Sequence, residues 1–245
     1  MTTLCIDIGN TALKWAVFRN NILLHHDRCE DLDLKRLLLA ASPFSPDAGM
    51  VCSTVDIPGH IKNDILQTPY PILFLNGQTP LPIVNRYLTP DTLGPDRIAA
   101  AVGAWQQQPD RNLLIIDSGT AITYDFVSAQ GEYLGGNISP GVDMRFRALH
   151  QFTAHLPFVD KSGEHPEIGN NTETAIRCGV LDGVKHEITG IIHELSLKYP
   201  KLSVFLTGGN IFSFDVSVKK RIFADNYLVL RGLDAILTYI NTKNA

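Results

Sequence analysis

The chain has 245 residues, of which 44% are hydrophobic and 19% charged, and its formal net charge is −4. Such a length and composition are typical of a globular protein with one large or two small domains. The mild acidity and the lack of any block of like charges argue against a nucleic-acid or membrane-surface partner. We expect no signal peptide and no membrane span, and the scattered cysteines, which form no C-x-x-C pair, predict reduced thiols in a cytoplasmic protein.

In the first half, apolar runs predict strands over residues 3–8, 13–18 and 21–26, a helix over 32–40, a strand over 51–55, a helix over 57–66 and a strand over 72–75. Three prolines, Pro80, Pro82 and Pro90, then predict an irregular connection. An alanine-rich segment predicts the next helix over residues 97–107, with Asp96 near its start.

The second half begins again with a pair of strands between Leu113 and Val127. A third strand is expected near residues 131–134, where Gly135-Gly136 would end it. The remaining pattern predicts helices over 142–150 and 172–199, strands over 204–206 and 227–230, and a closing helix over 233–241. Because no long linker is present, we expect two closely packed domains, residues 1–110 and 111–245, with the ligand in the cleft between them.

Two short segments of the chain look like copies of each other. Asp7-Ile8-Gly9-Asn10-Thr11 and Asp117-Ser118-Gly119-Thr120-Ala121 each follow an apolar strand and precede a second one. Each combines an acid, a glycine and a hydroxyl residue in what reads as a tight β-hairpin turn. The repetition indicates a duplicated fold, because internal similarity of this kind reflects the architecture of the whole chain.

Turns of this composition suit a nucleotide phosphate. Gly9 lets the backbone approach an anion closely, Thr11 can donate a hydroxyl hydrogen bond, and Lys14 can supply a positive charge. Asp7, at a strand end, is placed where Mg²⁺ would bridge phosphates, and Thr120 can reach a phosphate from the second turn. Asp117 follows four apolar residues, so we expect it to be half buried and to need a cation or several N–H donors. Each segment alone is compatible with a plain hairpin turn, but the second copy favours phosphate binding.

Four further segments contain candidate residues. In Gly94-Pro95-Asp96-Arg97, spacing alone favours Asp96 as an acid in the first turn of a helix; the alternative is a proton acceptor beside Arg97, which would bind a substrate carboxylate. Thr172 is readily explained as the N-cap of a helix. The glycine-rich turns at residues 135–141 and 207–210 could pass over a base or ribose, or be simple turns.

The full set of motifs, in this order, resembles the type III pantothenate kinases of the actin-like and sugar-kinase ATPase superfamily. The resemblance covers nearly the whole chain and depends most on Gly94-Pro95-Asp96-Arg97 lying between the two Asp-containing turns. It implies an α/β protein with a duplicated RNase H-like (actin-like ATPase) fold, in which two halves with mixed sheets are flanked by helices. It also implies a homodimer that transfers the γ-phosphate of ATP to pantothenate, giving 4'-phosphopantothenate in the first step of coenzyme A biosynthesis.

The resemblance further implies a role for individual residues. Asp96 would be the catalytic proton acceptor, and Asp117 would bind an activating monovalent cation, K⁺ or NH₄⁺, while Mg²⁺ accompanies ATP. The implied ATP-binding residues are Asp7, Ile8, Gly9, Asn10, Thr11, Ala12, Leu13, Lys14 and Thr120. The implied pantothenate-binding residues are Tyr87, Gly94, Pro95, Asp96, Arg97 and Thr172, the last reaching in from a second subunit.

Two other functions are compatible with the same motifs. One is another small-molecule kinase of the superfamily, which would differ in the segment from Tyr87 to Arg97. The other is a nucleotide-sensing regulator without turnover. The complete set of acids favours an enzyme, because a sensor needs no proton acceptor at Asp96.

Overall fold

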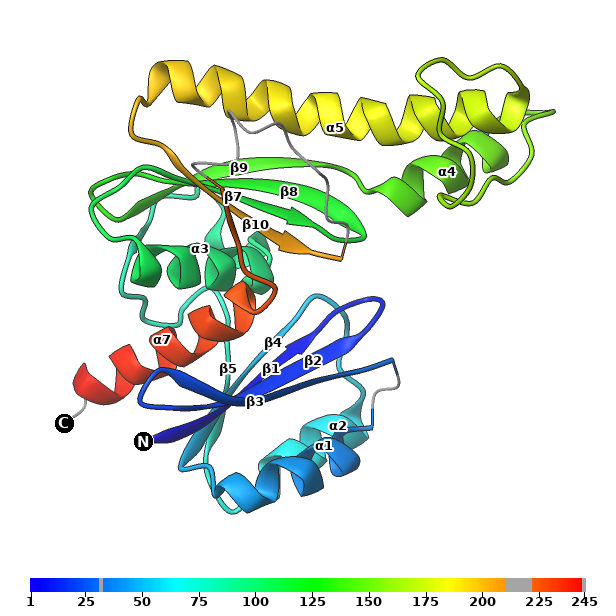
Figure 1. Ribbon diagram of the computed structural model, residues 1–245. Helices are drawn as coiled ribbons and strands as arrows, with labels where there is room; N and C mark the ends of the chain where they lie inside the picture. Colours follow the sequence, from blue (N-terminus) through cyan, green and yellow to red (C-terminus); the bar gives the residue numbers. More distant parts are fainter. Residues whose placement is uncertain (31–32, 210–221, 244–245) are drawn as a thin grey trace. The chain divides into compact units, whose positions relative to one another are not determined.

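The computed structural model describes residues 1–30, 33–209 and 222–243, and it contains two β-sheets (Figure 1). The first sheet has the strand order β3-β2-β1-β4-β5. In this sheet β1, β2 and β3 pair antiparallel, whereas β4 pairs parallel with both β1 and β5. Its strands are β1 (Thr2–Ile8), β2 (Leu13–Arg19), β3 (Ile22–Cys29), β4 (Ala48–Ser53) and β5 (Ile72–Phe74).

The second sheet repeats this topology. Its strand order is β11-β10-β7-β8-β9-β6, and β10 pairs parallel with both β7 and β11. The strands are β6 (Val84–Asn85), β7 (Leu113–Ser118), β8 (Ala121–Val127), β9 (Glu132–Pro140), β10 (Ser203–Gly208) and β11 (Ile222–Ala224). Read from β9 to β11, the order matches that of the first sheet from β3 to β5. The predicted α/β class, with a duplicated arrangement and two mixed sheets, is therefore confirmed.

The helices lie between groups of strands along the chain. They are α1 (Leu34–Ala41), α2 (Gly59–Leu66), α3 (Pro95–Gln107), α4 (Val142–Gln151), α5 (Thr172–Lys198) and α7 (Leu228–Lys243), with 3₁₀ turns η1 (Ser42–Phe44) and η2 (Pro90–Thr92). The first helix was expected to begin at Leu32, which lies outside the described residues. No helix of the described part of the chain is both long and apolar enough to cross a membrane.

The chain forms two compact units that interleave in sequence. Unit 1 contains residues 1–111, 125–135 and 227–245, and unit 2 contains residues 112–124 and 136–226. The units group residues that pack together, whereas the predicted halves, 1–110 and 111–245, follow the repeat in the sequence. The boundary between those halves stays a prediction. Each unit is described by itself below.

The central strand of unit 1, β1, is buried on both faces. On one face Leu4, Ile6 and Ile8 join a hydrophobic core with Trp15 and with side chains of α1 and α2. On the other face α7 packs against the strand, and the buried Thr3 hydroxyl donates a hydrogen bond to the Asp234 carboxylate of α7. Burial on both sides explains why β1 is apolar from Leu4 to Ile6, without the alternation of a half-exposed strand.

Helices α3 and α7 of unit 1 cross at very short range. Gly232 of α7 lies so close to α3 that a Cβ atom there would be 1.8 Å from the carbonyl oxygen of Ala99. Gly103 of α3 lies equally close to the backbone of α7, since a Cβ atom there would be 2.3 Å from the carbonyl oxygen of Leu228. The crossing therefore depends on the absence of side chains at both positions.

In unit 2 the long helix α5 lies along the sheet and extends past its edge to α4 (Figure 1). Glu187 of α5 accepts hydrogen bonds from the Tyr124 hydroxyl of β8 (2.7 Å) and the Ser139 hydroxyl of β9 (2.6 Å). Arg145 of α4 forms an ion pair with the same carboxylate. These contacts fix α4 and α5 relative to β8 and β9.

Two expectations about secondary structure were wrong. Residues 227–230 do not form a strand but lead into and begin α7. A short apolar run fits a buried helix as well as a buried strand, and here apolar residues are buried all round the helix start. Gly135-Gly136 also do not end a strand, because β9 continues through both of them to Pro140.

Candidate functional site

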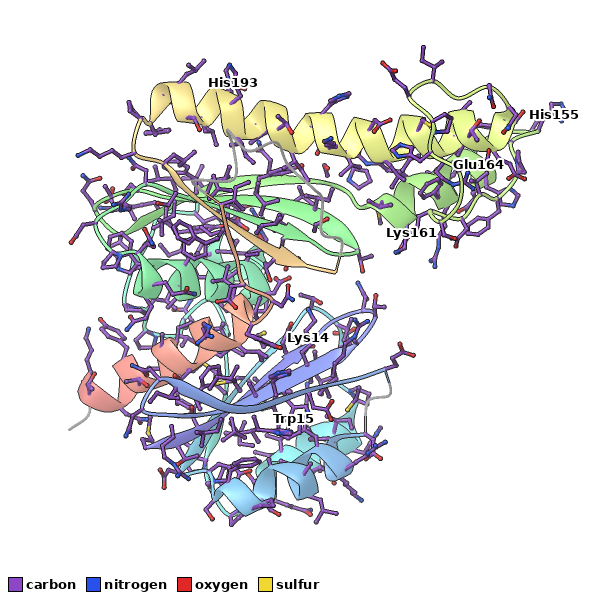
Figure 2. All side chains as sticks on the ribbon, viewed as in Figure 1. Lys14, Trp15, His155, Lys161, Glu164 and His193 are labelled. Atoms are coloured by element: carbon purple, nitrogen blue, oxygen red, sulfur yellow. The ribbon has the colours of Figure 1, made fainter. Side chains whose placement is uncertain are left out.

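The first predicted phosphate turn joins β1 to β2 in unit 1. Asp7 lies opposite Lys14 in the antiparallel register, and the Gly9 N–H donates to the Ala12 carbonyl oxygen (3.1 Å), which closes the turn. Figure 2 shows Lys14 on β2 near this turn. The side chains of Ile8 and Leu13 are buried in the core, whereas Asn10 and Thr11 are exposed. At Ile8 and Leu13, therefore, only the backbone is available to a phosphate.

Asp7 is a buried carboxylate with incomplete charge compensation. It is 8% exposed, and the Cys52 thiol of β4 donates a hydrogen bond to its Oδ1 (3.4 Å). Burial raises the pKa of Asp7 to about 6; Lys14 acts in the opposite direction, and the Asp96 carboxylate raises it further. A bound cation would stabilise the ionised form of such a buried carboxylate, so the site fits Mg²⁺ carried on a nucleotide.

Asp96 lies in the first turn of α3, but it is not the N-cap. Gly94 occupies the cap position and Pro95 begins the helix, while Oδ1 of Asp96 accepts a hydrogen bond from the Arg97 N–H (2.9 Å). Burial raises the pKa of Asp96, the Arg97 N–H lowers it, and the nearby Asp125 carboxylate raises it again. The net rise makes Asp96 a stronger proton acceptor near neutral pH than an exposed aspartate would be.

The structure thus brings two of the predicted acids within electrostatic range in unit 1. Asp7 comes from the end of a central strand, and Asp96 from the start of a helix 89 positions further along the chain. Two mutually repelling carboxylates, both disfavoured by burial, form a negatively charged site that a metal–phosphate group could neutralise.

Arg97 is held in place by a buried network. Its side chain is 6% exposed, and it donates to Oδ1 of Asp125 through Nε (3.0 Å) and Nη2 (2.6 Å). The Tyr133 hydroxyl donates to the same oxygen (2.6 Å), and the Arg97 guanidinium lies 5.9 Å from the centre of the Tyr87 ring. Burial opposes the charge of Arg97, but the Asp125 carboxylate outweighs it and raises the pKa of the guanidinium.

The sequence interpretation did not include Asp125 or Tyr133. Asp125 is 1% exposed and interrupts the apolar residues of β8. An acid in a buried strand requires a cation or several donors, and that signal was present in the sequence. The structure shows that this cation is Arg97, so the predicted carboxylate-binding residue is also part of the protein core.

The second predicted turn joins β7 to β8 and occupies the same place in the topology as the first, although it is shorter. The Gly119 N–H donates to the Ala121 carbonyl oxygen (3.1 Å), and Asp117 pairs with Thr207 of β10 as Asp7 pairs with Cys52 of β4. The carboxylate is half buried, as predicted. The two acids therefore occupy equivalent positions in the repeated topology.

Gly208 of β10 lies very close to Asp117. Gly208 has a φ of +99°, and a Cβ atom there would be 2.6 Å from Oδ1 of Asp117. The absence of a side chain at Gly208 therefore lets the backbone of β10 approach the carboxylate closely, and that carboxylate is a hard oxygen donor of the kind that a monovalent or alkaline-earth cation prefers. Thr120 is exposed on the same turn, and the last residue of the predicted segment 207–210, Asn210, lies outside the described residues.

Thr172 begins α5 in unit 2, but it is not the N-cap that the sequence suggested. Asn171 is the cap: its side chain accepts from the Thr174 N–H (2.9 Å), and the Thr174 hydroxyl completes a capping box. Thr172 is exposed and lines an apolar groove of about 850 Å³ between α4 and α5. Because Asn171 supplies the cap, the Thr172 side chain is not required for it.

Comparison with known proteins gives a family. The family model for type III pantothenate kinase matches residues 3–194. A type III pantothenate kinase from Bacteroides fragilis is 47% identical over 240 residues, which cover 98% of this chain and 99% of that protein. One from Porphyromonas gingivalis is 40% identical over 240 residues, covering 96% and 98%.

Solved structures with low sequence identity share the fold. A Baf family protein from Campylobacter jejuni superimposes with a TM-score of 0.60 at 20% identity, covering 98% of this chain and 99% of that one. MreB5 of Spiroplasma citri bound to ADP gives a TM-score of 0.51 at 12% identity, covering 100% and 99%. The predicted actin-like fold is therefore confirmed.

Proposed function

Because this chain belongs to the type III pantothenate kinase family, we propose that it transfers the γ-phosphate of ATP to the primary hydroxyl of pantothenate. The product is 4'-phosphopantothenate, the first intermediate on the route to coenzyme A. The observation that carries this proposal is the high identity to family members along almost the whole chain. The paired acids Asp7 and Asp96 support it, because such a transfer requires one acid near the metal-linked phosphate and one acid that accepts a proton.

Asp96 accepts the proton of the attacking hydroxyl in this proposal. Phosphoryl transfer passes through a loose transition state, so positioning and charge neutralisation contribute most and the proton leaves late. The raised pKa of Asp96 supports the role, since an acceptor works best when its pKa approaches the working pH. Such a group contributes on the order of 10²- to 10⁴-fold to the rate.

Both hairpin turns supply phosphate contacts in this proposal. Lys14 and the backbone from Asp7 to Leu13 bind phosphate at the first turn, and Thr120 is the phosphate contact of the second turn. The burial of Asp7 supports a metal-linked phosphate at the first turn. Mg²⁺, when bound with the nucleotide, would neutralise the β- and γ-phosphate oxygens.

Asp117 binds the activating monovalent cation, K⁺ or NH₄⁺. The half-buried carboxylate at the end of β7, a hard oxygen donor, supports this assignment. The equivalent position of Asp7 in the first repeat is consistent with a pair of acids that serve two different cations.

Arg97 binds the carboxylate of pantothenate, and Tyr87, Gly94 and Pro95 line the same subsite. The ion pair with Asp125 fixes the guanidinium, which supports a role in orientation. Thr172 completes the subsite from a second subunit. The exposed apolar groove beside it, which includes Phe152 at 80% exposure, supports a homodimer in which a second copy covers that groove. Four free cysteines support a cytoplasmic location.

A steady-state assay with ATP, Mg²⁺ and K⁺ tests the activity, with pantothenate, N-acetylglucosamine, glucose and acetate compared as acceptors. We expect ADP release that depends on pantothenate alone. Turnover with another acceptor would identify a different kinase, and ATP binding without any turnover would identify a regulator.

The variant Asp96→Asn tests the mechanism. We expect kcat to fall by about 10²- to 10⁴-fold with the KM for ATP changed little, because the amide keeps the shape but accepts no proton. Asp91→Asn is the matched control, since Asp91 is an exposed acid in the preceding 3₁₀ turn η2. An unchanged kcat in Asp96→Asn would exclude Asp96 as the proton acceptor.

A further inference from the structure

Three potential metal ligands of different chemistry meet in unit 2, in the part of the chain that precedes and begins α5. The ligand atoms of His165, Cys178 and Asp182 all lie within 4.8 Å of one another. Nε2 of His165 is 3.1 Å from Oδ2 of Asp182, and the Cys178 thiol donates to the Pro166 carbonyl oxygen (3.0 Å). No other cluster of three such side chains occurs in the described ranges 1–30, 33–209 and 222–243.

Two of the three ligands come from one face of a rigid helix. Cys178 and Asp182 are four residues apart on α5, so their side chains lie one above the other on the same face. Cys178 is buried at 7% exposure, whereas His165 and Asp182 are partly exposed. A metal ion could therefore enter from solvent and still reach the buried sulfur.

The loop that supplies His165 is fixed to α5 by Arg177. The Arg177 Nε donates to the Asp160 carbonyl oxygen (3.0 Å), and its Nη1 donates to the Glu164 carbonyl oxygen (2.9 Å). Figure 2 shows Glu164 of this loop beside the N-terminal part of α5, and Lys161 beside α4. Both anchoring bonds are made by the residue next to Cys178, so the histidine and the thiol are brought together by contacts independent of any metal.

We propose that His165, Cys178 and Asp182 form a binding site for Zn²⁺ or a similar divalent transition metal, with water completing the coordination. Imidazole nitrogen, thiolate sulfur and carboxylate oxygen are the protein ligands that Zn²⁺ uses. Binding releases the Cys178 proton to solvent, and the resulting thiolate together with the Asp182 carboxylate balances the charge of the ion.

The geometry requires only side-chain adjustment. Metal–ligand bonds of about 2.0–2.3 Å at tetrahedral angles separate neighbouring donor atoms by about 3.3–3.6 Å. The His165–Asp182 separation already lies near this range, and the remaining separations exceed its upper end by at most about 1.2 Å. A small rotation of Cys178 away from the Pro166 carbonyl would bring its sulfur to the ion.

This site differs in chemistry from the cation sites of the proposed kinase reaction. Mg²⁺ and K⁺ prefer hard oxygen ligands and do not bind thiolate well. Asp7 and Asp117 lie in the hairpin turns, and neither belongs to this cluster. A bound metal would fasten the loop before Asn171, the N-cap of α5, to the helix itself.

Titration of the full-length, metal-free protein with Co²⁺ in excess Mg²⁺ tests the proposal. Co²⁺ replaces Zn²⁺ in such sites, and a thiolate ligand gives a near-ultraviolet charge-transfer band. We expect the band in the wild type and in Cys29→Ser, a control thiol on β3 of unit 1. We expect complete loss of the band in Cys178→Ser and at least about tenfold weaker Co²⁺ binding in His165→Asn, because even outer-shell partners contribute that much.

Trypsin cleavage after Lys161 gives a second readout in case Cys178→Ser disturbs the fold. Zn²⁺ should slow this cleavage in the wild type and should not slow it in His165→Asn, whose exposed side chain can be changed without loss of packing. Three results would overturn the proposal: no charge-transfer band in the wild type, a band that persists in Cys178→Ser, or equal Co²⁺ affinity in His165→Asn and the wild type.

Discussion

Removing the buried carboxylate of Asp125 should destabilise unit 1 strongly. Asp125 is 1% exposed, and Arg97 and Tyr133 converge on one of its oxygens through three short hydrogen bonds. The variant Asp125→Leu leaves the guanidinium buried without its counter-charge and the tyrosine hydroxyl without its acceptor. Breaking a buried ion pair by removing one partner costs about 3–5 kcal/mol.

This loss is a large part of the whole stability, which is typically about 5–15 kcal/mol for a folded domain. Arg97→Met should cost a similar amount, because it leaves a buried carboxylate. The double variant Arg97→Met/Asp125→Leu should lose much less than the sum of the two single losses. Replacing both charges by apolar side chains leaves neither a buried guanidinium nor a buried carboxylate without its counter-charge at this position.

Urea unfolding followed by tryptophan fluorescence measures these losses. The only two tryptophans, Trp15 on β2 and Trp105 on α3, both belong to unit 1, where the ion pair lies. Glu132→Gln is the matched control, because Glu132 forms an ion pair with Arg86 in the same unit and that Arg86 side chain is 59% exposed. It should cost no more than about 1 kcal/mol. Equal losses in Asp125→Leu and Glu132→Gln, or simple addition of the two single losses in the double variant, would refute the reasoning.

Three further predictions concern single residues. The pKa of Asp7 is about 6, well above its unfolded value near 4, so the native state binds a proton more tightly than the unfolded state does. The free energy of unfolding should therefore fall by up to about 3 kcal/mol as the pH rises from about 4 to 6. Asp7→Asn should remove that fall in pH-dependent urea titrations, and an unchanged profile would mean that Asp7 ionises normally. Gly232→Ala should lower the stability by at least about 2 kcal/mol, because the new Cβ would meet the Ala99 carbonyl oxygen. Gly183→Ala on α5, with open space around it, should instead raise the stability by up to about 1 kcal/mol. Thermal unfolding that ranks the two variants in the opposite order would contradict this prediction. Finally, kinase assays in Na⁺ should be slower than in K⁺, and Asp117→Ala should lose this sensitivity together with most turnover; equal rates of the wild type in both salts would exclude the cation site.

The sequence was sufficient for features that are local. The Asp-containing turns follow apolar runs long enough to be central strands, and the same pattern occurs twice, so both hairpins and the duplicated topology could be predicted. The start of α3 could also be predicted, because Gly94 and Pro95 terminate the preceding segment and begin a helix. In each case the signal lies within about ten residues of the feature.

Features that depend on distant contacts could not be predicted in this way. Arg97 and Asp125 are 28 positions apart, and nothing in their spacing shows that they form a pair. The segment from Tyr227 to Leu230 has the apolar residues of a strand, and only its packing against α3 makes it helical. Thr172 and Asn171 are both good caps, so the choice between them depended on which backbone conformation the helix start adopts.

The contact between α7 and β1 has a consequence for biosynthesis. Thr3 is synthesised 231 residues before its partner Asp234. At translation rates of about 5–20 residues per second, the first strand waits roughly 12–50 seconds before its second face can be covered. A transcript truncated before codon 228 would therefore yield a nascent chain with an uncovered apolar strand, which is a substrate for chaperones and proteases and not a shorter working protein.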